Sequence, residues 1–518
     1  MNALNTRATQ FATSLAAARR YGQQKTTAQQ DAERFHVVGV GRTISSVYEQ
    51  VRNAAEYTED HLLLQRAVRR FYTRLFLARD EKRIAQSGED LVTELTFAGY
   101  LANDSVTLET TAELSRAAKA YYGAYTKITG QPIRTLQSWT VDVLAIEADA
   151  MLRDYMVREA FEQFVFDHFN ASIDTASLYG EVTPKEYELL LFVAVHRALL
   201  KSDDATIRWA LLRRFEQKPH ATAQYRQANE HIDTILVSKQ VERLQRLVTK
   251  EGAVFRVLWR TISEENETAT MMDQPKKFLP FFEDAVNATY EDAERRMNRG
   301  VLRSILFLFI TKALIGVAIE IPYDLWAHDA ILWLPLMVNL LIPPVYMFLL
   351  RLTLKLPGSA NTRALVAQAD QLLYGETPMS YTAARQSRQY GFIFNTVYAL
   401  LIIAIFGAAS WLLMSIGFSI VHLVIFFIFF STASFLGFRL SRTIRELETV
   451  ESGQDGVAMV RDFIYLPFVV VGRKLSESYA KFNIVATLLD MVIELPLKTM
   501  LQVMRRWGSF ISSKKDEL

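Results

Sequence analysis

The feature that most constrains this chain is a run of 50 residues, Gln389–Phe438, that contains no Asp, Glu, Lys or Arg. A single helix of that length would measure about 75 Å at about 1.5 Å per residue, whereas the hydrocarbon core of a bilayer is about 30 Å thick. The run therefore predicts two membrane-spanning helices. Gly417 lies in a natural turn, so we expect the spans at 391–415 and 419–438.

Two further apolar segments precede this run. Residues 330–350 carry no charged side chain and predict another span. Residues 304–323 are also apolar, but they contain Lys312 and Glu320. This segment fits either a span or an amphipathic helix on the membrane surface, and we favour a span because the next span needs a partner to complete a hairpin.

The distribution of basic residues in short loops predicts the orientation of the spans. Arginines precede the first span, follow the fourth and occur in the loop 351–390, whereas the segment 323–329 has two acids and no base. Both ends of the bundle and its middle loop should therefore lie in the cytoplasm. Tyr323, Trp326 and Trp333 fit an aromatic belt at the outer surface of the membrane.

The first 300 residues have the polar and apolar periodicity of soluble helices. Thr183–Glu186 forms a capping box with proline at the first helical position, and Ser202–Asp204 should cap a second helix. Residues 219–262 predict one long helical segment. It fits either a coiled coil that pairs two chains or an amphipathic helix packed in its own domain, and its irregular heptads favour the second.

The C-terminal segment contains one more amphipathic pattern. Asp490, Glu494 and Lys498 follow one another at four-residue intervals within the apolar stretch 483–504, so they form one polar stripe on a helix. Such a helix should lie in the membrane interface or pack on the bundle. A fifth span is the less favoured alternative.

These patterns together predict an all-α protein. A helical cytoplasmic region is followed by a helical transmembrane bundle of about four spans and by the C-terminal amphipathic helix. No secretory signal precedes the soluble region, which supports a cytoplasmic location. The predicted divisions are a basic amphipathic tail (1–34), one or more soluble helical domains (35–270), a linker and juxtamembrane helix (271–300), the bundle (301–440) and a cytoplasmic or interfacial segment (441–518).

The C-terminal part also resembles a group of known sequences. The motifs Glu320–Tyr323, Ile464–Pro467, Gly472–Arg473 and Asp490–Lys498 are similar to those of uncharacterised multi-spanning membrane proteins of reduced-genome candidate-phyla bacteria. The resemblance implies a bacterial inner-membrane setting and no activity. If the source were eukaryotic, the acid-free N-terminal 30 residues or the terminal Lys-Asp-Glu-Leu would favour a mitochondrial or endoplasmic-reticulum membrane instead.

Composition excludes several kinds of chemistry. The chain has no cysteine, which excludes disulfides, zinc–thiolate sites, iron–sulfur ligation and a cysteine nucleophile. A net charge of +2 gives no case for nucleic-acid binding. The histidine, phosphate-loop and nucleophile-elbow motifs of common enzymes do not occur, so the sequence predicts no cofactor, metal or catalytic residue. For a lipid-modifying enzyme, the sequence offers hardly any candidate catalytic residue besides His328 near the outer interface.

The strongest candidates for a functional site are polar residues at membrane depth. Lys312 lies nine residues beyond Arg303, about 13 Å along a helix and hence near the bilayer centre. A charge there costs several kcal/mol unless it is paired or hydrated. Glu320 falls on a similar helix face. The candidates for a solute or ion path are Lys312, Glu320, Asn339, Asn395 and His422, with a helix kink or break at Pro343 and Pro344; the alternative is a purely structural cluster.

From the sequence we favour a membrane-anchored scaffold or adaptor that binds protein partners through its cytoplasmic helical region and contacts the lipid bilayer through its spans. This interpretation needs the fewest unseen motifs. The alternative is a channel or transporter subunit in which Lys312 and Glu320 line the path. Four spans are few for a transporter, so such a path would need a homo-oligomer.

Overall fold

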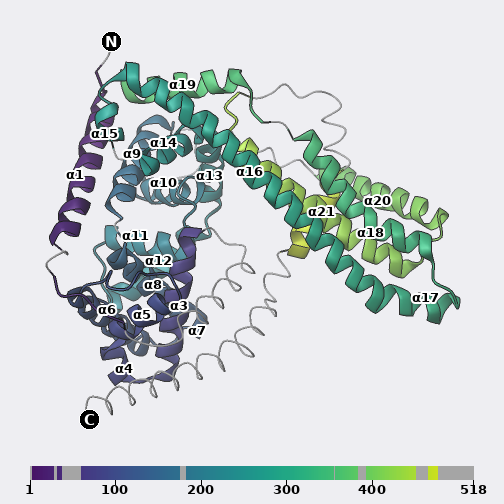
Figure 1. Ribbon diagram of the computed structural model, residues 1–518, viewed down its shortest axis with the longest axis horizontal. Helices are drawn as coiled ribbons and strands as arrows, with labels where there is room; N and C mark the ends of the chain where they lie inside the picture. The colour runs from purple at the N-terminus through teal and green to yellow at the C-terminus, as the bar shows by residue number, and fades with distance from the viewer. Residues whose placement is uncertain are drawn as a thin grey trace, which may run out of the picture. The chain divides into compact units, whose positions relative to one another are not determined.

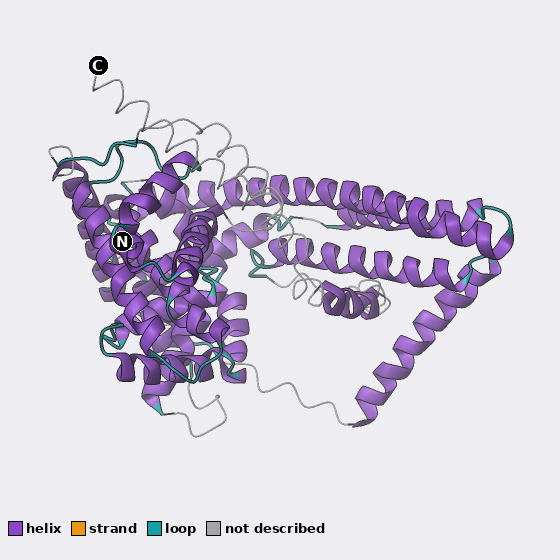
Figure 2. Cartoon of the chain, turned by 90° about the horizontal axis from the view of Figure 1, so that it is seen from below, coloured by secondary structure: helices purple, strands orange, loops and turns teal. Residues whose placement is uncertain are grey.

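The computed structural model describes residues 3–28, 32–37, 60–153, 155–174, 183–265, 267–354, 356–377, 379–382, 392–450 and 465–476. Within these ranges the regular structure is helical, apart from isolated bridge residues that include the antiparallel pair Arg34 and Thr107. Figure 2 accordingly shows helices and connecting loops in the described residues. The predicted all-α fold is confirmed.

The chain divides into two compact units, which we describe separately. The first, here called the N-terminal helical unit, comprises the described parts of Leu4–Ile173 and Gly180–Val248. Its helices are α1 (Thr6–Ala28), α3 (Asp60–Ala78), α4 (Glu81–Ala85), α5 (Ser87–Phe97), α6 (Leu108–Lys127), α7 (Ile133–Trp139), α8 (Val141–Leu152), α9 (Met156–Ser172), α10 (Pro184–Ala198), α11 (Asp204–Arg214), α12 (Thr222–Leu236) and α13 (Lys239–Glu251).

Helix α8 lies at the centre of this unit. Four consecutive residues, Val143 to Ile146, are fully buried, so every side of the helix is covered. It packs against α3, α6, α7 and α11. The N-terminal segment that the sequence predicts as a basic tail forms α1 between residues 6 and 28, and Phe11 of α1 stacks on Phe164 of α9 at 4.3 Å between ring centroids.

The predicted helix caps occur in this unit, but the predicted long helix does not. The side chains of Thr183 and Asp203 accept hydrogen bonds from the backbone N–H groups at the starts of α10 and α11. Residues 219–262 form three helices, α12, α13 and α14 (Ala253–Glu264), instead of one. Breaks occur at Ser238, whose hydroxyl accepts a bond from Gln240 N, and at Gly252.

The second compact unit, here called the membrane unit, contains the described part of Thr249–Val485. Figure 1 labels most of its helices. They are α14, α15 (Thr268–Met271), α16 (Pro275–Ile315), the π-helical turn Gly316–Glu320, α17 (Ile321–His328), α18 (Trp333–Thr353), α19 (Ser359–Tyr374), α20 (Phe392–Ser415), α21 (Ile420–Arg445) and a helix at 465–476.

Four helical segments of this unit are long and apolar enough to cross a membrane: Pro275–His328, Trp333–Thr353, Thr396–Ser415 and Ile420–Arg445. The number agrees with the prediction, and the segment at 304–323 belongs to a helix of spanning length. Large apolar side chains on this helix are exposed, including Phe307 at 55%, Ile310 at 63% and Leu314 at 68%. An exposed surface of this kind is stable in lipid and not in water, so the protein is an integral membrane protein.

Helix α16 is the longest helix of the membrane unit and contacts most of its other helices (Figure 1). It has 41 residues and continues through the π-helical turn into α17. Helices α14, α15 and α19 pack on α16, and so do the spans α18 and α21. The spans α18 and α21 approach closely, because a Cβ atom added to Gly437 would lie 2.1 Å from Leu350 Cδ2. This packing fixes the three helices that supply the polar cluster described next.

Candidate functional site

The membrane unit buries a cluster of five polar side chains, here called the intramembrane cluster. They come from three packed segments of the bundle, and each is at most 1% exposed. Its members are Lys312 on α16, Glu320 at the end of the π-helical turn, Asp324 on α17, Asn339 on α18 and His422 on α21. Groups of this polarity are rare at membrane depth, which makes the cluster the candidate functional site.

Lys312 and Glu320 form an ion pair at one end of the cluster. Nζ of Lys312 donates to Oε1 of Glu320, and the ammonium also lies 5.3 Å from the centre of the Phe429 ring. The same Oε1 accepts a bond of 3.1 Å from Asn339 Nδ2. The pair is therefore held by a charge-assisted hydrogen bond, an amide donor and a cation–π contact.

Asn339 connects the ion pair to helix α21. Its Nδ2 also donates to the backbone carbonyl oxygen of His422 at 3.2 Å. One side-chain amide thus bridges the first, second and fourth spans. A bridge of this type fixes the relative register of three helices, because every donor buried in hydrocarbon must find an acceptor within the protein.

His422 and Asp324 form the other end of the cluster. Nε2 of His422 lies 3.5 Å from Oδ1 of Asp324, and Nδ1 lies 2.8 Å from the hydroxyl of Ser419. The second oxygen of Asp324, Oδ2, accepts a bond of 3.0 Å from Leu332 N. Asp324 therefore closes the turn between the first two spans with one oxygen and faces the histidine with the other.

Four buried polar atoms of the cluster have no hydrogen-bond partner. They are Glu320 Oε2, Asp324 Oδ1, Asn339 Oδ1 and His422 Nε2. Three of these atoms are acceptors, and the fourth is the histidine nitrogen that faces Asp324. Leaving such atoms unpaired costs free energy of folding, so a cluster that retains them is suited to bind a species that the folded chain does not itself supply.

The π-helical turn shapes the space beside Glu320. A π-helical turn adds a residue to the helical repeat, and such turns occur frequently at functional sites. The nearest atom to a Cβ built on Gly316 would be Glu320 Oε2, at 3.9 Å. Glycine therefore adds no side chain against the unpartnered carboxylate oxygen, which is itself buried by the rest of the bundle.

The structure brings most of the predicted site residues together. Lys312, Glu320, Asn339 and His422 meet in one cluster. Asn395 lies in α20, and its side chain is outside the described residues. His328 is exposed near the end of α17 and does not belong to the cluster.

The other predicted residues are the two prolines of α18 and the polar stripe of the C-terminal segment. Helix α18 continues through Pro343 and Pro344, so the two prolines do not end it. Asp490, Glu494 and Lys498, with the predicted amphipathic helix around them, lie outside the described residues.

Asp324 is the member of the candidate site that sequence reasoning missed. The sequence places it in the outer loop, where it counts only as one of two acids. In the structure the helix extends to His328, and Asp324 is fully buried. Its spacing of four residues from Glu320 was the available signal, because residues four apart share a helix face.

The described residues offer no metal centre. Among them, no group of three or more His, Cys, Asp or Glu side chains is placed to hold a metal ion. The intramembrane cluster instead combines two carboxylates, an ammonium, an imidazole and an amide. Such a set can exchange protons or hold a small charged species, since it contains both acidic and basic groups that titrate.

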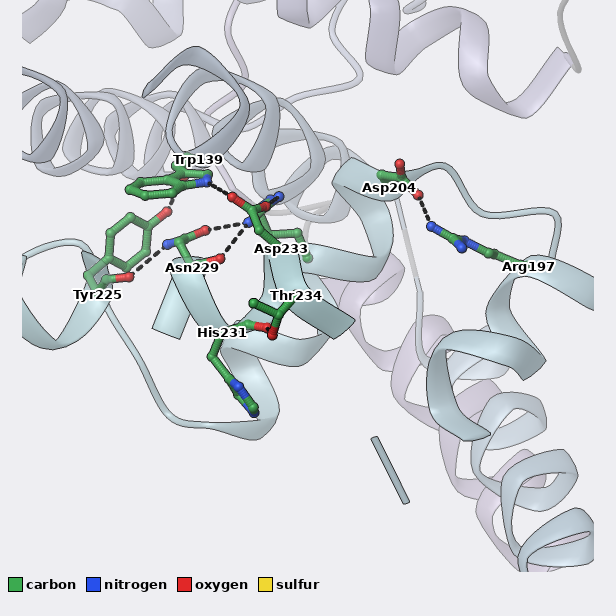
Figure 3. A network of polar contacts seen from close by, with 9 residues as sticks. Trp139, Arg197, Asp204, Tyr225, Asn229, His231, Asp233 and Thr234 are labelled. Atoms are coloured by element: carbon green, nitrogen blue, oxygen red, sulfur yellow. Dashed lines mark hydrogen bonds and ion pairs between the residues drawn. The ribbon is translucent and has the colours of Figure 1, made fainter. Parts of the chain in front are cut away.

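The N-terminal helical unit contains a second polar network, shown in Figure 3. Arg208 pairs with Asp233 and donates to Asn229 Oδ1 at 3.0 Å. Trp139 Nε1 donates to the other oxygen of Asp233 at 3.0 Å, and Tyr225 donates from its hydroxyl to Trp139 O. This network joins α7, α11 and α12, and the side chain of Asp233 is 41% exposed at its rim.

The fold and the intramembrane cluster define the chain as an α-helical integral membrane protein with four candidate spans. No protein-family model, curated protein or solved structure matches it.

Proposed function

We propose that this protein is a membrane transport subunit in which the intramembrane cluster forms part of an ion path. The observation that carries the proposal is the complete burial of Lys312, Glu320, Asp324 and His422 together with unpartnered acceptor atoms among them. Ionisable groups at membrane depth mark ion or proton pathways in membrane proteins. A set that served only to hold the helices together would be expected to satisfy its own hydrogen bonds.

The path would be completed by further copies of the chain. Only 6% of the most apolar stretch of Thr396–Ser415 is buried, compared with 50% for Ile420–Arg445. The third candidate span therefore presents much of its surface to lipid or to another subunit. This arrangement supports an oligomeric transport unit.

Charge movement through the reconstituted protein tests the proposal. The full chain is adsorbed in proteoliposomes on a solid-supported membrane, and jumps in the concentration of H⁺, Na⁺, K⁺ or Cl⁻ are applied. We expect a protein-dependent current for one of these ions in the wild type and its loss in Glu320→Gln and Lys312→Ala. The control is Glu294→Gln, which removes a partly exposed ion pair with Arg351 outside the cluster. Equal currents in all proteins and in empty liposomes would contradict the proposal.

The second candidate function is a scaffold or adaptor that binds protein partners through the N-terminal helical unit. It is supported by the size of that unit, whose described helices include none of the four candidate spans. Photo-crosslinking from Val237, an exposed apolar residue at 82%, tests it in cells. A recurrent crosslinked protein is expected, and the absence of any crosslinked species would count against this function.

The proposed setting is a bacterial inner membrane with both chain ends in the cytoplasm. Its support is the placement of arginines around the spans and the resemblance of the C-terminal motifs. The chain has no cysteine, so a single cysteine can be introduced at Ala327 or Asp370 without further changes. An impermeant maleimide should label Ala327→Cys in intact cells and Asp370→Cys only in opened cells. The reverse pattern would contradict the orientation.

A further inference from the structure

The formal charges of the intramembrane cluster do not balance. Glu320 and Asp324 each carry one negative charge, Lys312 carries one positive charge, and a neutral His422 adds none. All four side chains are at most 1% exposed. The formal charges therefore sum to −1 in a medium where an uncompensated charge is costly. Uptake of a single positive charge would neutralise it.

The surplus negative charge faces the histidine. Lys312 pairs with Glu320, so the carboxylate without a cationic partner is Asp324. Its Oδ1 and His422 Nε2 lie 3.5 Å apart, and neither atom has a hydrogen-bond partner. An added proton on the imidazole would supply the missing charge and, whichever nitrogen carries the hydrogen of the neutral ring, would make Nε2 a donor facing Asp324 Oδ1.

We infer that the membrane unit binds one proton at the His422–Asp324 pair, an inference that rests on the proposed transport function and names the species bound. A hydronium ion transfers a proton to the free lone pair of the neutral imidazole, which leaves water and converts the ring to an imidazolium. Both ring nitrogens are then donors. Nε2 donates to Asp324 Oδ1, and Nδ1 donates to the Ser419 hydroxyl, 2.8 Å away.

The surroundings of His422 are consistent with a reversible proton site. Helix α17 contributes Asp324, Tyr323 and His328 to its electrostatic surroundings, the π-helical turn contributes Glu320, and α16 contributes Lys312. Helix α18 contributes Asn339, which contacts the backbone of His422. Burial and the neighbouring bases oppose the imidazolium, whereas the two acids favour it. Because the two acids lie on the same segment and only Glu320 is paired with the lysine, the balance at His422 depends on Asp324.

A proton suits this site better than a metal cation. Calcium requires about six to eight oxygen ligands and magnesium a near-octahedral set, whereas the unpartnered oxygen atoms of the cluster number three. These three oxygens also belong to different side chains, which lie on the π-helical turn, on α17 and on α18. A proton needs only the one nitrogen and its facing carboxylate.

Solid-state NMR of the full chain in lipid bilayers tests the inference. The eight histidines are labelled with ¹⁵N, and spectra are recorded at about pH 8 and about pH 5. The His422 signal is assigned as the one absent from His422→Gln, and His328→Gln serves as the matched control. We expect the His422 signal to change from the neutral form to the imidazolium form, with less imidazolium at a given pH in Asp324→Asn. A signal that stays neutral in the folded wild type would overturn the inference.

Two outcomes separate this inference from the proposed function. If His422 titrates but no ion jump produces a current, the proton site stands and the transport function fails. If a current depends on Glu320 while His422 stays neutral at both pH values, the transport function stands and the proton site fails. A His422 signal that changes on addition of Na⁺ at constant pH would also overturn the proton assignment, because the bound species would then be a metal cation.

Discussion

Each of the two compact units contains a network of charged and polar side chains, but the two networks differ in how many of their hydrogen-bonding atoms have partners. In the N-terminal helical unit, the hydrogen-bonding atoms of Asp233, Asn229 and Trp139 have partners within the network. In the membrane unit, four atoms of the intramembrane cluster have none. The first network is therefore sufficient to hold its helices, whereas the second holds its helices and retains capacity for another species.

Access to water separates the two networks further. Asp233 is 41% exposed, so water can solvate its charge at the rim of the network. Glu320 and Asp324 are fully buried, so their charges depend on the protein alone. Loss of a partner should consequently cost more free energy in the intramembrane cluster than in the N-terminal network. The following predictions test this difference, from the largest expected effect to the smallest.

Removal of Glu320 should give the largest loss of stability. Glu320→Ala leaves Lys312 charged and unpaired in the bundle, which should cost about 3–5 kcal/mol of folding free energy. The double variant Lys312→Leu with Glu320→Leu should recover most of that loss, because it removes both charges. Thermal unfolding of the full chain in nanodiscs measures both. A double variant as unstable as the single one would show that the pair has another structural role.

Acid should destabilise the N-terminal helical unit through His168. Burial lowers the pKa of His168 from 6.5 to about 4, with a further contribution from the positive charge of Arg7. The unfolded chain therefore binds a proton at a higher pH than the folded chain. Stability is fully present above about pH 6.5 and falls by about 3 kcal/mol as the pH drops toward 4. Hydrogen exchange of α9 should report the loss, and His168→Phe should reduce it; an unchanged profile in that variant would assign the loss to other groups.

Removal of Asp233 should have a smaller effect than removal of Glu320. Asp233→Ala leaves Arg208 buried but near water, so we expect a loss of about 2 kcal/mol. Hydrogen exchange of α11 and α12 in the full chain should accelerate about 30-fold, which corresponds to that free energy. The control is Asp204→Ala, which removes an exposed partner of Arg197. Equal acceleration in both variants would contradict a specific role for the network.

Substitution of Gly316 should change stability least. The added methyl group of Gly316→Ala would meet Glu320 Oε2 at an ordinary contact distance of 3.9 Å, so the folding free energy should change by less than about 1 kcal/mol. The methyl group lies against the unpartnered oxygen, so any ion current should fall severalfold. Gly407→Ala is the matched control, since nothing lies within 4 Å of a Cβ at that position. Equal currents in the two variants would exclude a role for the unpartnered oxygen.

Much of the architecture could be predicted from sequence because the bilayer imposes it. Long uncharged runs specify spans directly, and the distance of Lys312 from Arg303 places the lysine at membrane depth. The location of Lys312 and Glu320 on a similar helix face follows from their spacing of eight residues, but their direct contact does not, because residues eight apart lie about 12 Å apart along a regular helix axis. These features depend on local sequence and on bilayer thickness, both of which can be evaluated without knowledge of the tertiary packing.

The features that sequence could not supply depend on contacts between helices or on local breaks. Asn339 and His422 belong to the cluster because α18 and α21 pack on α16, a relation that no spacing along the chain encodes. Asp324 was assigned to a loop because the helix was expected to end near Tyr323. The long helix predicted at 219–262 was wrong because periodicity alone does not reveal the breaks at Ser238 and Gly252.

The length of α16 has a mechanical consequence. Its 41 residues extend over about 60 Å, and Lys312 lies about 50 Å from Phe278 along the same rod. A continuous α-helix couples a rotation or a sliding movement at one end to the other end, and in α16 the internal Pro280 lies close to the N-terminal end of the helix. A rotation of α16 by a few degrees at Lys312 would thus also move the surfaces on which α14 and α19 pack. Binding of a charged species within the bilayer would in this way be mechanically coupled to the distant parts of the membrane unit.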